Sequence, residues 1–252
     1  MIQTMMTMVV LNSMEIKSYL LNWIKHQSSS SPVISGLNAK IDTTGINDTS
    51  NSSRISPLIR TVDITDIDFS HMSSIAHLFY GCYNLSEITG LDFLVSTNIS
   101  NISYVLDNCS SLTNLDDVSY WNVKNVTNFR NCFNTCSGYS GSLDLTTWNT
   151  KKGMNFNTMF SGCSGLTEII FGSNFSLEGI GYANGLDNFV KNCDNLNSNT
   201  LNAILGLLLT LPQGFLGTKT LKNIGFSSSQ CTTAITLSNW SDCVSAGWST
   251  GY

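Results

Sequence analysis

The chain has 252 residues, which is long enough to bury a large hydrophobic core, and its formal net charge is −5 at pH 7. Only 12% of its residues are charged, and its 12 Lys and Arg residues are scattered along the sequence. This pattern lacks the basic patch that binds a phosphate backbone, so nucleic acid is not an expected partner. Ser, Thr and Asn supply the polar surface instead, which suits a weakly charged protein that works outside a cell.

Residues 1–54 are predicted to form an N-terminal helix and an extended connector. Met1 to Leu11 contains an apolar run, but it has neither a basic flank nor a small-residue cleavage site, so it is not interpreted as a signal peptide. Ser13 to His26 has the pattern of an amphipathic helix capped by Ser13. Its apolar face carries Ile16, Tyr19, Leu20, Trp23 and Ile24.

Two roles for this helix remain open. It either packs on the first turn of the domain that follows, or it attaches the protein to a partner or to a sister chain. The Ser-rich linker Ser28 to Pro32 weakens the first role, because it separates the helix from the rest of the chain. The two roles are held equal at this point.

Residues 55–197 are organised by a 27-residue repeat. Four cysteines follow one another at this step and a fifth comes after a slightly longer interval: Cys82, Cys109, Cys136, Cys163 and Cys193. An apolar residue stands three positions before each of them: Phe79, Leu106, Phe133, Phe160 and Val190. Further apolar residues stand four and seven positions before each Cys, a spacing that predicts one face of a short α-helix. The expected N-caps of these helices are Ser74, Asn101, Asn128, Asn155 and Gly185.

The second half of each copy is predicted to be a strand, because apolar residues return after each Cys, as at Leu85 and Ile88 or at Leu166 and Ile169. One helix–strand copy cannot bury its apolar face alone, whereas stacked copies bury a continuous core. The predicted fold is therefore an α/β solenoid, a leucine-rich-repeat-like stack of about five 27-residue helix–strand turns with an N-terminal helical segment and a C-terminal cap. The five cysteines and the five apolar residues before them are expected to form a structural ladder inside it.

The repeats resemble a known family in their sequence as well as in their period. Leu78 to Leu85, Trp121 to Asn128 and Met159 to Leu166 are similar to BspA-type leucine-rich repeats, and the resemblance covers roughly Pro57 to Asn197. Gly247 to Tyr252 is similar to the tails of such proteins in gut bacteria and their phages. The resemblance implies a non-enzymatic surface or binding module of the kind found on bacterial adhesins and phage structural proteins.

Residues 198–252 are predicted to cap the open end of the stack. Asn199 or Thr200 is expected to cap a helix that ends at Pro212 and that is too short to cross a bilayer, so no membrane insertion is expected. This helix carries Leu201, Ile204, Leu205, Leu208 and Leu211. A strand is expected over Thr220 to Gly225, and two short helices are expected over Ser228 to Thr233 and Ser238 to Ala246.

Eight cysteines would suggest disulfides in a secreted protein, but five of them hold one repeated core position, which favours free thiols. Cys132 and Cys136 are spaced to share a metal, but Cys132 replaces a core residue, so packing is favoured. The state of Cys231 and Cys243 is open.

No catalytic residue, cofactor site or metal site is predicted. The sequence has no His-Glu-x-x-His or Gly-x-Ser-x-Gly motif and no phosphate-binding Gly-rich loop. Asp63, Asp66 and Asp68 cluster, but their spacing is not that of an EF-hand. His77 falls between core positions and is expected to be exposed.

The favoured function is a non-enzymatic phage virion structural protein, of the tail or head fibre or decoration type, that folds in the host cytoplasm. It would display the repeats to a host surface protein or glycan, and residues 1–54 would attach it to other virion proteins or to sister chains. The missing signal peptide and the expected free thiols favour this interpretation. The alternative is a BspA-like adhesin at the bacterial cell surface or in the extracellular space. No sequence motif supports a third possibility, a carbohydrate-active enzyme on a repeat scaffold.

Overall fold

The computed structural model describes residues 60–64, 73–93 and 98–252. The predicted N-terminal helix with Ile16, Tyr19, Leu20, Trp23 and Ile24 lies outside these residues, as do Asp66 and Asp68. The boundary expected between residues 54 and 55 lies outside them too.

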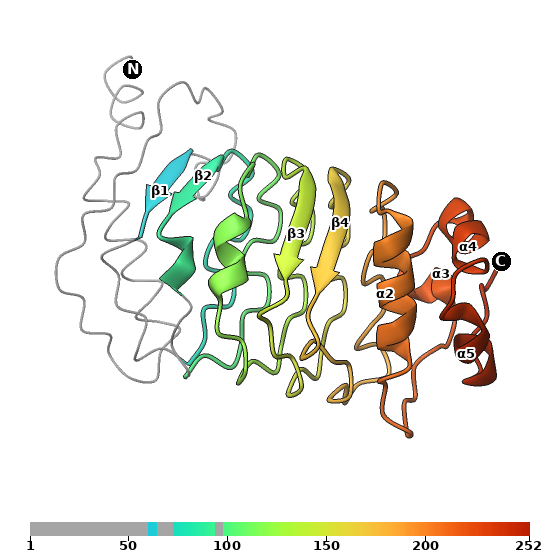
Figure 1. The fold of residues 1–252 in the computed structure, drawn as a ribbon. Coiled ribbons are helices and arrows are strands. Elements are labelled where there is room, and N and C mark those ends of the chain that lie inside the picture. Colours follow the sequence, from blue (N-terminus) through green and yellow to red (C-terminus); the bar gives the residue numbers. More distant parts are fainter. Residues whose placement is uncertain (1–59, 65–72, 94–97) are drawn as a thin grey trace, which may run out of the picture.

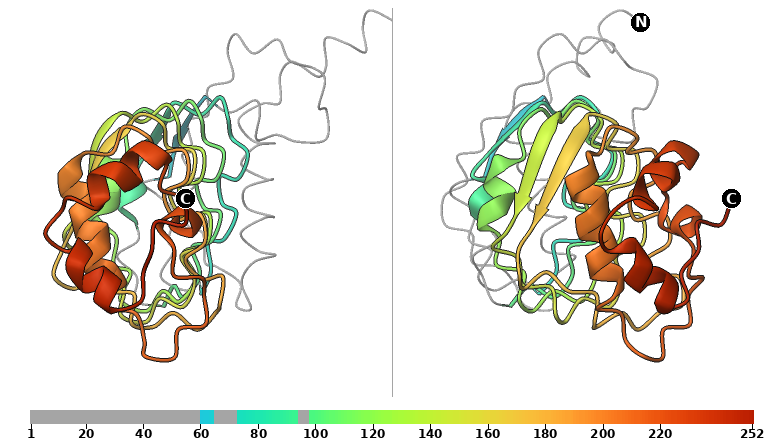
Figure 2. Two further views of the ribbon diagram at one scale, coloured as in Figure 1. Left: turned by 90° about the vertical axis from the view of Figure 1, so that its right-hand side faces the viewer. Right: turned by 45° about the vertical axis from the view of Figure 1, so that its right-hand side comes forward.

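Successive copies of the repeat lie side by side in a solenoid-like arrangement. Parallel bridges join Ser74 to Asn101, Asn101 to Asn128, and Asn128 to Asn155, so equivalent positions of adjacent copies are neighbours in space. Viewed from the C-terminal end, the copies lie over one another (Figure 2). Equivalent apolar residues therefore meet, and they build one core that extends from Val62 to Trp248.

Strands form only part of the layer predicted for them (Figure 1). β1 (Thr61–Asp63) pairs in parallel with β2 (Glu87–Thr89), and β3 (Gly141–Leu145) pairs in parallel with β4 (Leu166–Phe171). The copy between these two sheets has the 3-10 helix η4 (Asp116–Tyr120) where a strand was expected, and η3 (Leu91–Phe93) follows β2. The strand layer of the described residues is therefore two short parallel sheets.

The helices predicted before each Cys are wrong. In the first described copy the N–H groups of Leu78 and Cys82 donate to the carbonyls of Ile75 and Phe79, three residues earlier, as in successive β-turns. The N–H groups of every second residue from Ile75 to Gly81 donate instead to carbonyls of the next copy, over 2.9–3.0 Å. Half of the amide groups in this segment thus join neighbouring copies, which an α-helix does not allow.

Left-handed residues enforce this succession of turns. They stand five and one positions before each Cys, with φ between 54° and 78°. The residues at the first position are His77, Tyr104, Asn131, Thr158 and Asn188, and those at the second are Gly81, Asn108, Thr135, Gly162 and Asn192. A right-handed helix cannot continue through a left-handed residue. The turns still point the predicted apolar set inward, so the spacing of apolar residues did not distinguish them from a helix.

The predicted N-cap residues accept hydrogen bonds but start turns rather than helices. The side-chain oxygens of Asn101, Asn128 and Asn155 accept from the backbone N–H two residues later, at 3.0, 3.2 and 3.0 Å. Ser74 accepts in the same way at 3.2 Å. This is the Asx or Ser turn, in which the side chain mimics a backbone carbonyl.

The helix α2 (Ser198–Leu208) covers the edge of the second sheet. Its N-cap is Asn197, whose side chain accepts from the N–H of Thr200, so the predicted caps Asn199 and Thr200 were wrong. Thr200 instead faces β4, where its hydroxyl accepts from the N–H of Ile169 at 2.9 Å and donates to the Ile169 carbonyl at 3.5 Å. The hydroxyl thereby pairs an edge that another strand would otherwise occupy.

Three short helices complete the C-terminal end: α3 (Leu221–Ile224), α4 (Ser228–Ala234) and α5 (Trp240–Ser245). The last two lie where two helices were predicted, whereas α3 replaces the predicted strand at Thr220 to Gly225. The C-cap of α3 is Gly225, whose φ is 103°. In the described part of the chain, no helix combines the length and apolar character needed to cross a membrane.

Candidate binding surface

One surface of the stack, on its layer of turns, combines aromatic, amide, hydroxyl and charged side chains. We call it the turn face and define it by the outward positions five and two residues before each Cys: His77, Tyr80, Tyr104, Asp107, Asn131, Asn134, Thr158, Ser161, Asn188 and Lys191. All of these except Asp107 are half-buried or exposed. Hydrogen-bonded neighbouring copies place equivalent residues about 4.8 Å apart, so the turn face consists of two parallel rows of side chains.

Three aromatic rings gather at the N-terminal end of the turn face. The rings of His77 and Tyr104 stack with their centroids 4.5 Å apart and their planes at 9°. Tyr80 stands edge-on to both rings, at 5.5 Å from His77 and 6.2 Å from Tyr104, and 43% of its surface is exposed. The guanidinium of Arg130 lies 5.7 Å from the centroid of Tyr104, within the range of a cation–π contact. We call His77, Tyr80 and Tyr104 the aromatic cluster.

A buried carboxylate supports the turn face next to this cluster. Asp107 accepts hydrogen bonds from the side-chain amides of Asn134 at 2.7 Å and Asn131 at 3.4 Å. Burial raises the pKa of Asp107, while the two amides and His77 oppose that rise. Burial also lowers the pKa of His77, so its imidazole is neutral at neutral pH. The two hydrogen bonds thereby join the side chains of two adjacent copies.

The sequence model of one family, described as "Mycoplasma protein of unknown function, DUF285", matches residues 73–202, just over half of the chain. The chain belongs to the DUF285 family. The match contains the whole cysteine repeat and the whole turn face. It supports the resemblance to BspA-type repeats, whereas nothing in the comparisons points to a phage.

Two solved structures resemble the DUF285 chain. One is a leucine-rich cell surface protein from Faecalibacterium prausnitzii, at 16% identity and a TM-score of 0.28, which covers 56% of this chain and 42% of that protein. The other is the leucine-rich repeat protein of T. pallidum, at 14% identity and a TM-score of 0.27, which covers 64% of this chain and 81% of that protein. No curated protein sequence matches the chain. The chain thus spans less than half of the Faecalibacterium protein, and neither likeness transfers a role to it.

The structure places the predicted ladder of the DUF285 repeat entirely in the core. The five ladder cysteines are at most 4% exposed, and the five apolar residues before them are at most 1% exposed. Four of the thiols donate to carbonyls of the preceding copy: Cys109 to Phe79 at 3.2 Å, Cys136 to Leu106 at 3.2 Å, Cys163 to Phe133 at 3.0 Å and Cys193 to Phe160 at 2.9 Å. The ladder is therefore a row of sulfur–carbonyl contacts as well as a row of small apolar groups.

Burial lowers the reactivity expected of the cysteines. All eight are buried, and none forms a disulfide with another, including Cys231 and Cys243. Burial raises the pKa of Cys82 to about 12, and it raises the pKa of Cys109 and Cys132 well above the ordinary value, which disfavours the nucleophilic thiolate. Cys132 packs in the core at 0% exposure, and no group of three metal-ligating side chains occurs among the described residues. The redox state of the thiols in solution stays a prediction.

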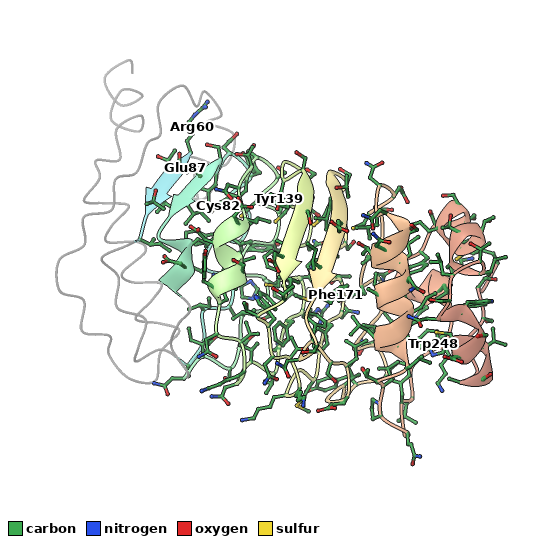
Figure 3. All side chains as sticks on the ribbon, in the orientation of Figure 1. Arg60, Cys82, Glu87, Tyr139, Phe171 and Trp248 are labelled. Carbon is green, nitrogen blue, oxygen red and sulfur yellow. The ribbon has the colours of Figure 1, made fainter. Side chains whose placement is uncertain are left out.

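Sequence reasoning missed the aromatic cluster, although it placed His77 correctly on the surface. The sequence pattern singled out neither Tyr80 nor Tyr104, because it gave no reason to expect aromatic side chains of adjacent copies to meet. The available signal was the 27-residue step itself, because it brings His77 and Tyr104 to equivalent positions of adjacent copies. Figure 3 shows the side chains of the described residues along the whole stack, from Cys82 to Trp248.

Proposed function

We propose that the chain is a non-enzymatic binding module that works at a bacterial cell surface or in the extracellular space, and that its turn face contacts the partner. The observation that carries the proposal is the aromatic cluster, which presents stacked rings and a 43% exposed tyrosine beside rows of amide and hydroxyl groups. Aromatic rings with a polar rim are favoured at interfaces, because they bring a large contact area and lose little conformational entropy.

The rest of the molecule would hold this surface in place. In the proposal residues 55–197 display the turn face, residues 198–252 close the stack, and residues 1–54 attach the protein to a sister chain or another partner. The chain needs no cofactor for such a role. Repeat proteins commonly bind through one extended face, because stacking sets equivalent positions in regular rows.

The phage virion role is not the function proposed, because neither the family match nor the structural likenesses provide support for it. A surface role also needs no catalytic centre. The thiols lie in the core, and the Asp107 carboxylate accepts from two side-chain amides of the next copy.

Adhesion of the full chain to cells tests the proposal. The full-length protein is labelled and titrated on bacterial cells and on epithelial cells, next to a triple variant, His77→Asn/Tyr80→Ser/Tyr104→Asn. Each replacement is a residue that another copy carries at the same position, as in Asn131 and Ser161, so the fold accommodates it. Tyr120→Ala is the matched control, since Tyr120 is 67% exposed in η4, away from the turn face.

We expect saturable binding by the wild type and by the control, and at least a tenfold weaker binding by the triple variant. Absence of saturable binding to any cell would overturn the proposal. Equal loss in the control and the triple variant would show that the turn face is not the surface used.

A further inference from the structure

We propose that the aromatic cluster is a subsite for a neutral sugar, and that a neutral oligosaccharide lies along the turn face over Asn131, Asn134, Thr158 and Ser161. This inference rests on the proposed function, because it names the ligand class of the same surface. The strain, the exposure and the spacing of the turn-face residues support it.

The ring of Tyr104 stands where the turn does not need one. Tyr104 has a φ of 59°, a conformation that bulky residues rarely adopt, whereas His77, with a φ of 64°, is a residue type that adopts it more readily. Equivalent positions in the later copies carry Asn131, Thr158 and Asn188, so the turn forms without an aromatic residue. Strained residues that the fold does not require are found mostly at functional sites. The aromatic character of Tyr104 is therefore assigned to a ligand.

The cluster is also organised before any ligand arrives. Tyr104 lies between the imidazole of His77 on one copy and the guanidinium of Arg130 on the next, and Tyr80 is held edge-on to the stacked pair. The paired amides of Asn131 and Asn134 fix the surface beside it through Asp107. Binding to such a surface orders few side chains, so little of the interaction free energy is lost.

The chemistry of the surface matches a neutral sugar. A pyranose ring has an apolar face of C–H groups, which would pack on the exposed ring of Tyr80, held edge-on to Tyr104. It also has a rim of hydroxyl groups, which bond to amides, hydroxyls and phenols. The imidazole is neutral and Asp107 accepts from two side-chain amides, so neither offers a free charge to a ligand. Arg130 keeps its charge beside Tyr104, and its N–H groups can donate to sugar hydroxyls. Stacked bases would also suit the rings, but a nucleic acid needs a basic groove, and Lys191 is the one lysine of the turn face.

The repeat sets the spacing at which successive sugar units would meet the protein. Beyond the cluster the two rows continue as Asn131 and Asn134, then as Thr158 and Ser161, and each step along the stack is about 4.8 Å. One sugar unit of an extended chain has about that length, so successive units would meet successive copies. The hydroxyl of Thr158 already donates to the side-chain oxygen of Asn131 at 2.5 Å, which holds the polar row in register.

The test uses the full chain and neutral oligosaccharides as probes. One arm contains neutral host-type glycans of increasing length, starting from the monosaccharide, and a second arm contains neutral fragments of bacterial polysaccharides. Binding is followed by calorimetry and by the chemical shifts of the tyrosine rings. The variants are Tyr104→Asn and Tyr80→Ser, with Tyr120→Ala as the control, and thermal melts are recorded for all of them.

We expect binding in one of the two arms, with affinity that rises with chain length, and a loss of at least tenfold in Tyr104→Asn and in Tyr80→Ser. Tyr104→Asn should melt no lower than the wild type, because Asn adopts the left-handed conformation more readily than Tyr. The thermal melt of Tyr104→Asn therefore distinguishes the loss of a ligand contact from damage to the fold.

The inference is overturned if no neutral oligosaccharide binds, or if both turn-face variants bind as the wild type does. Should the full chain still adhere to cells through its turn face while free sugars neither bind nor compete, the ligand is a protein. The sugar inference then fails and the proposed binding function stands. Loss of adhesion itself would instead remove the proposed function.

Discussion

A single thiol serves two purposes at four of the five ladder positions. It is small enough to let neighbouring copies approach, and its S–H donates to a carbonyl of the preceding copy, at 2.9–3.2 Å in four cases. Serine would place a more strongly polar hydroxyl in the same apolar core, and alanine would leave the carbonyl without this contact. Cysteine is thus the residue that satisfies both the packing and the weak hydrogen bond.

The buried thiols make stability depend on pH at the alkaline end. Burial raises the pKa of Cys82 from an ordinary value of 9.0 to about 12. Between these values the folded state keeps a proton that the unfolded state releases, so the free energy of unfolding falls as pH rises. We expect urea melts to show full stability below about pH 9 and a progressive loss towards about pH 12.

A variant with Cys136→Ala should lose less stability over the same window, because one titrating group is gone.

Wild-type protein denatured without reductant should contain at least five free thiols, as expected for the ladder. A free energy of unfolding that does not change with pH across this window would contradict the burial of reduced thiols.

At the scale of the element, the turn layer differs from a helix in where its amide groups point. Every second N–H between Ile75 and Gly81 reaches the next copy, so each segment is stable only beside its neighbours. The apolar residues of successive segments then stack, as Phe133 does on Phe160 at 5.6 Å with planes at 3°. Backbone bonds and ring stacking therefore act along the same axis.

Phe133→Ala should destabilise the protein by about 3–5 kcal/mol, because a buried Phe leaves a cavity between two copies. Phe133 is fully buried and also lies 6.1 Å from both Trp121 and Trp148. Urea melts measure the effect, with Tyr120→Ala as an exposed control that should change little. A loss below about 1 kcal/mol would mean that the core around Phe133 is assigned wrongly.

Thr200→Val should weaken the contact between α2 and β4. The replacement keeps the shape of the side chain but leaves the buried N–H of Ile169 without its 2.9 Å partner, which costs about 1–3 kcal/mol. Thr146→Val, at an exposed position after β3, is the control and should stay within about 0.5 kcal/mol of the wild type. Equal melting of the two variants would show that Thr200 does not close the sheet edge.

At the scale of the whole molecule, one continuous core joins the repeats to the C-terminal helices. It extends from Val62 in β1 through the ladder to Cys243 in α5 and Trp248. The same hydrogen-bond pattern continues past the cysteine repeat, since Val190 donates to Ile224 at 3.1 Å and Leu221 to Ser249 at 2.9 Å. The C-terminal region therefore extends the stack as well as covering it.

Removal of residues 1–31 should leave this core folded. The expected result is a cooperative melt close to that of the full chain, because the core residues from Val62 onward supply its packing. The same deletion should abolish self-association or attachment to a partner, measured by light scattering and by cell adhesion. A large loss of cooperative melting would show that the segment with Trp23 caps the stack instead.

Much of the core could be predicted from the sequence, and much of the surface could not. The 27-residue step identified the ladder residues from Phe79 to Cys193, all of which are buried, because a stack must bury whatever repeats at an apolar position. The step did not predict the backbone conformation of the segments before each Cys. Asn108 and Gly162, one residue before a Cys, already favoured left-handed turns there. The strand predicted in the second copy does not form, since η4 stands there, and the N-cap of α2 is Asn197 instead of the predicted Asn199 or Thr200.

The sequence by itself determined the period, the inward set of residues and the stacking of copies. A repeated apolar pattern is removed from water when successive copies stack and bury their apolar residues against one another. Only the tertiary structure decided the conformation between those residues. Carbonyls of the next copy lie within reach of alternate N–H groups, and these bonds replace the local bonds of a helix. The same stacking brought His77 and Tyr104, one repeat apart in the sequence, to 4.5 Å, and so created the aromatic cluster. A surface shared by two copies exists only once the copies are placed together.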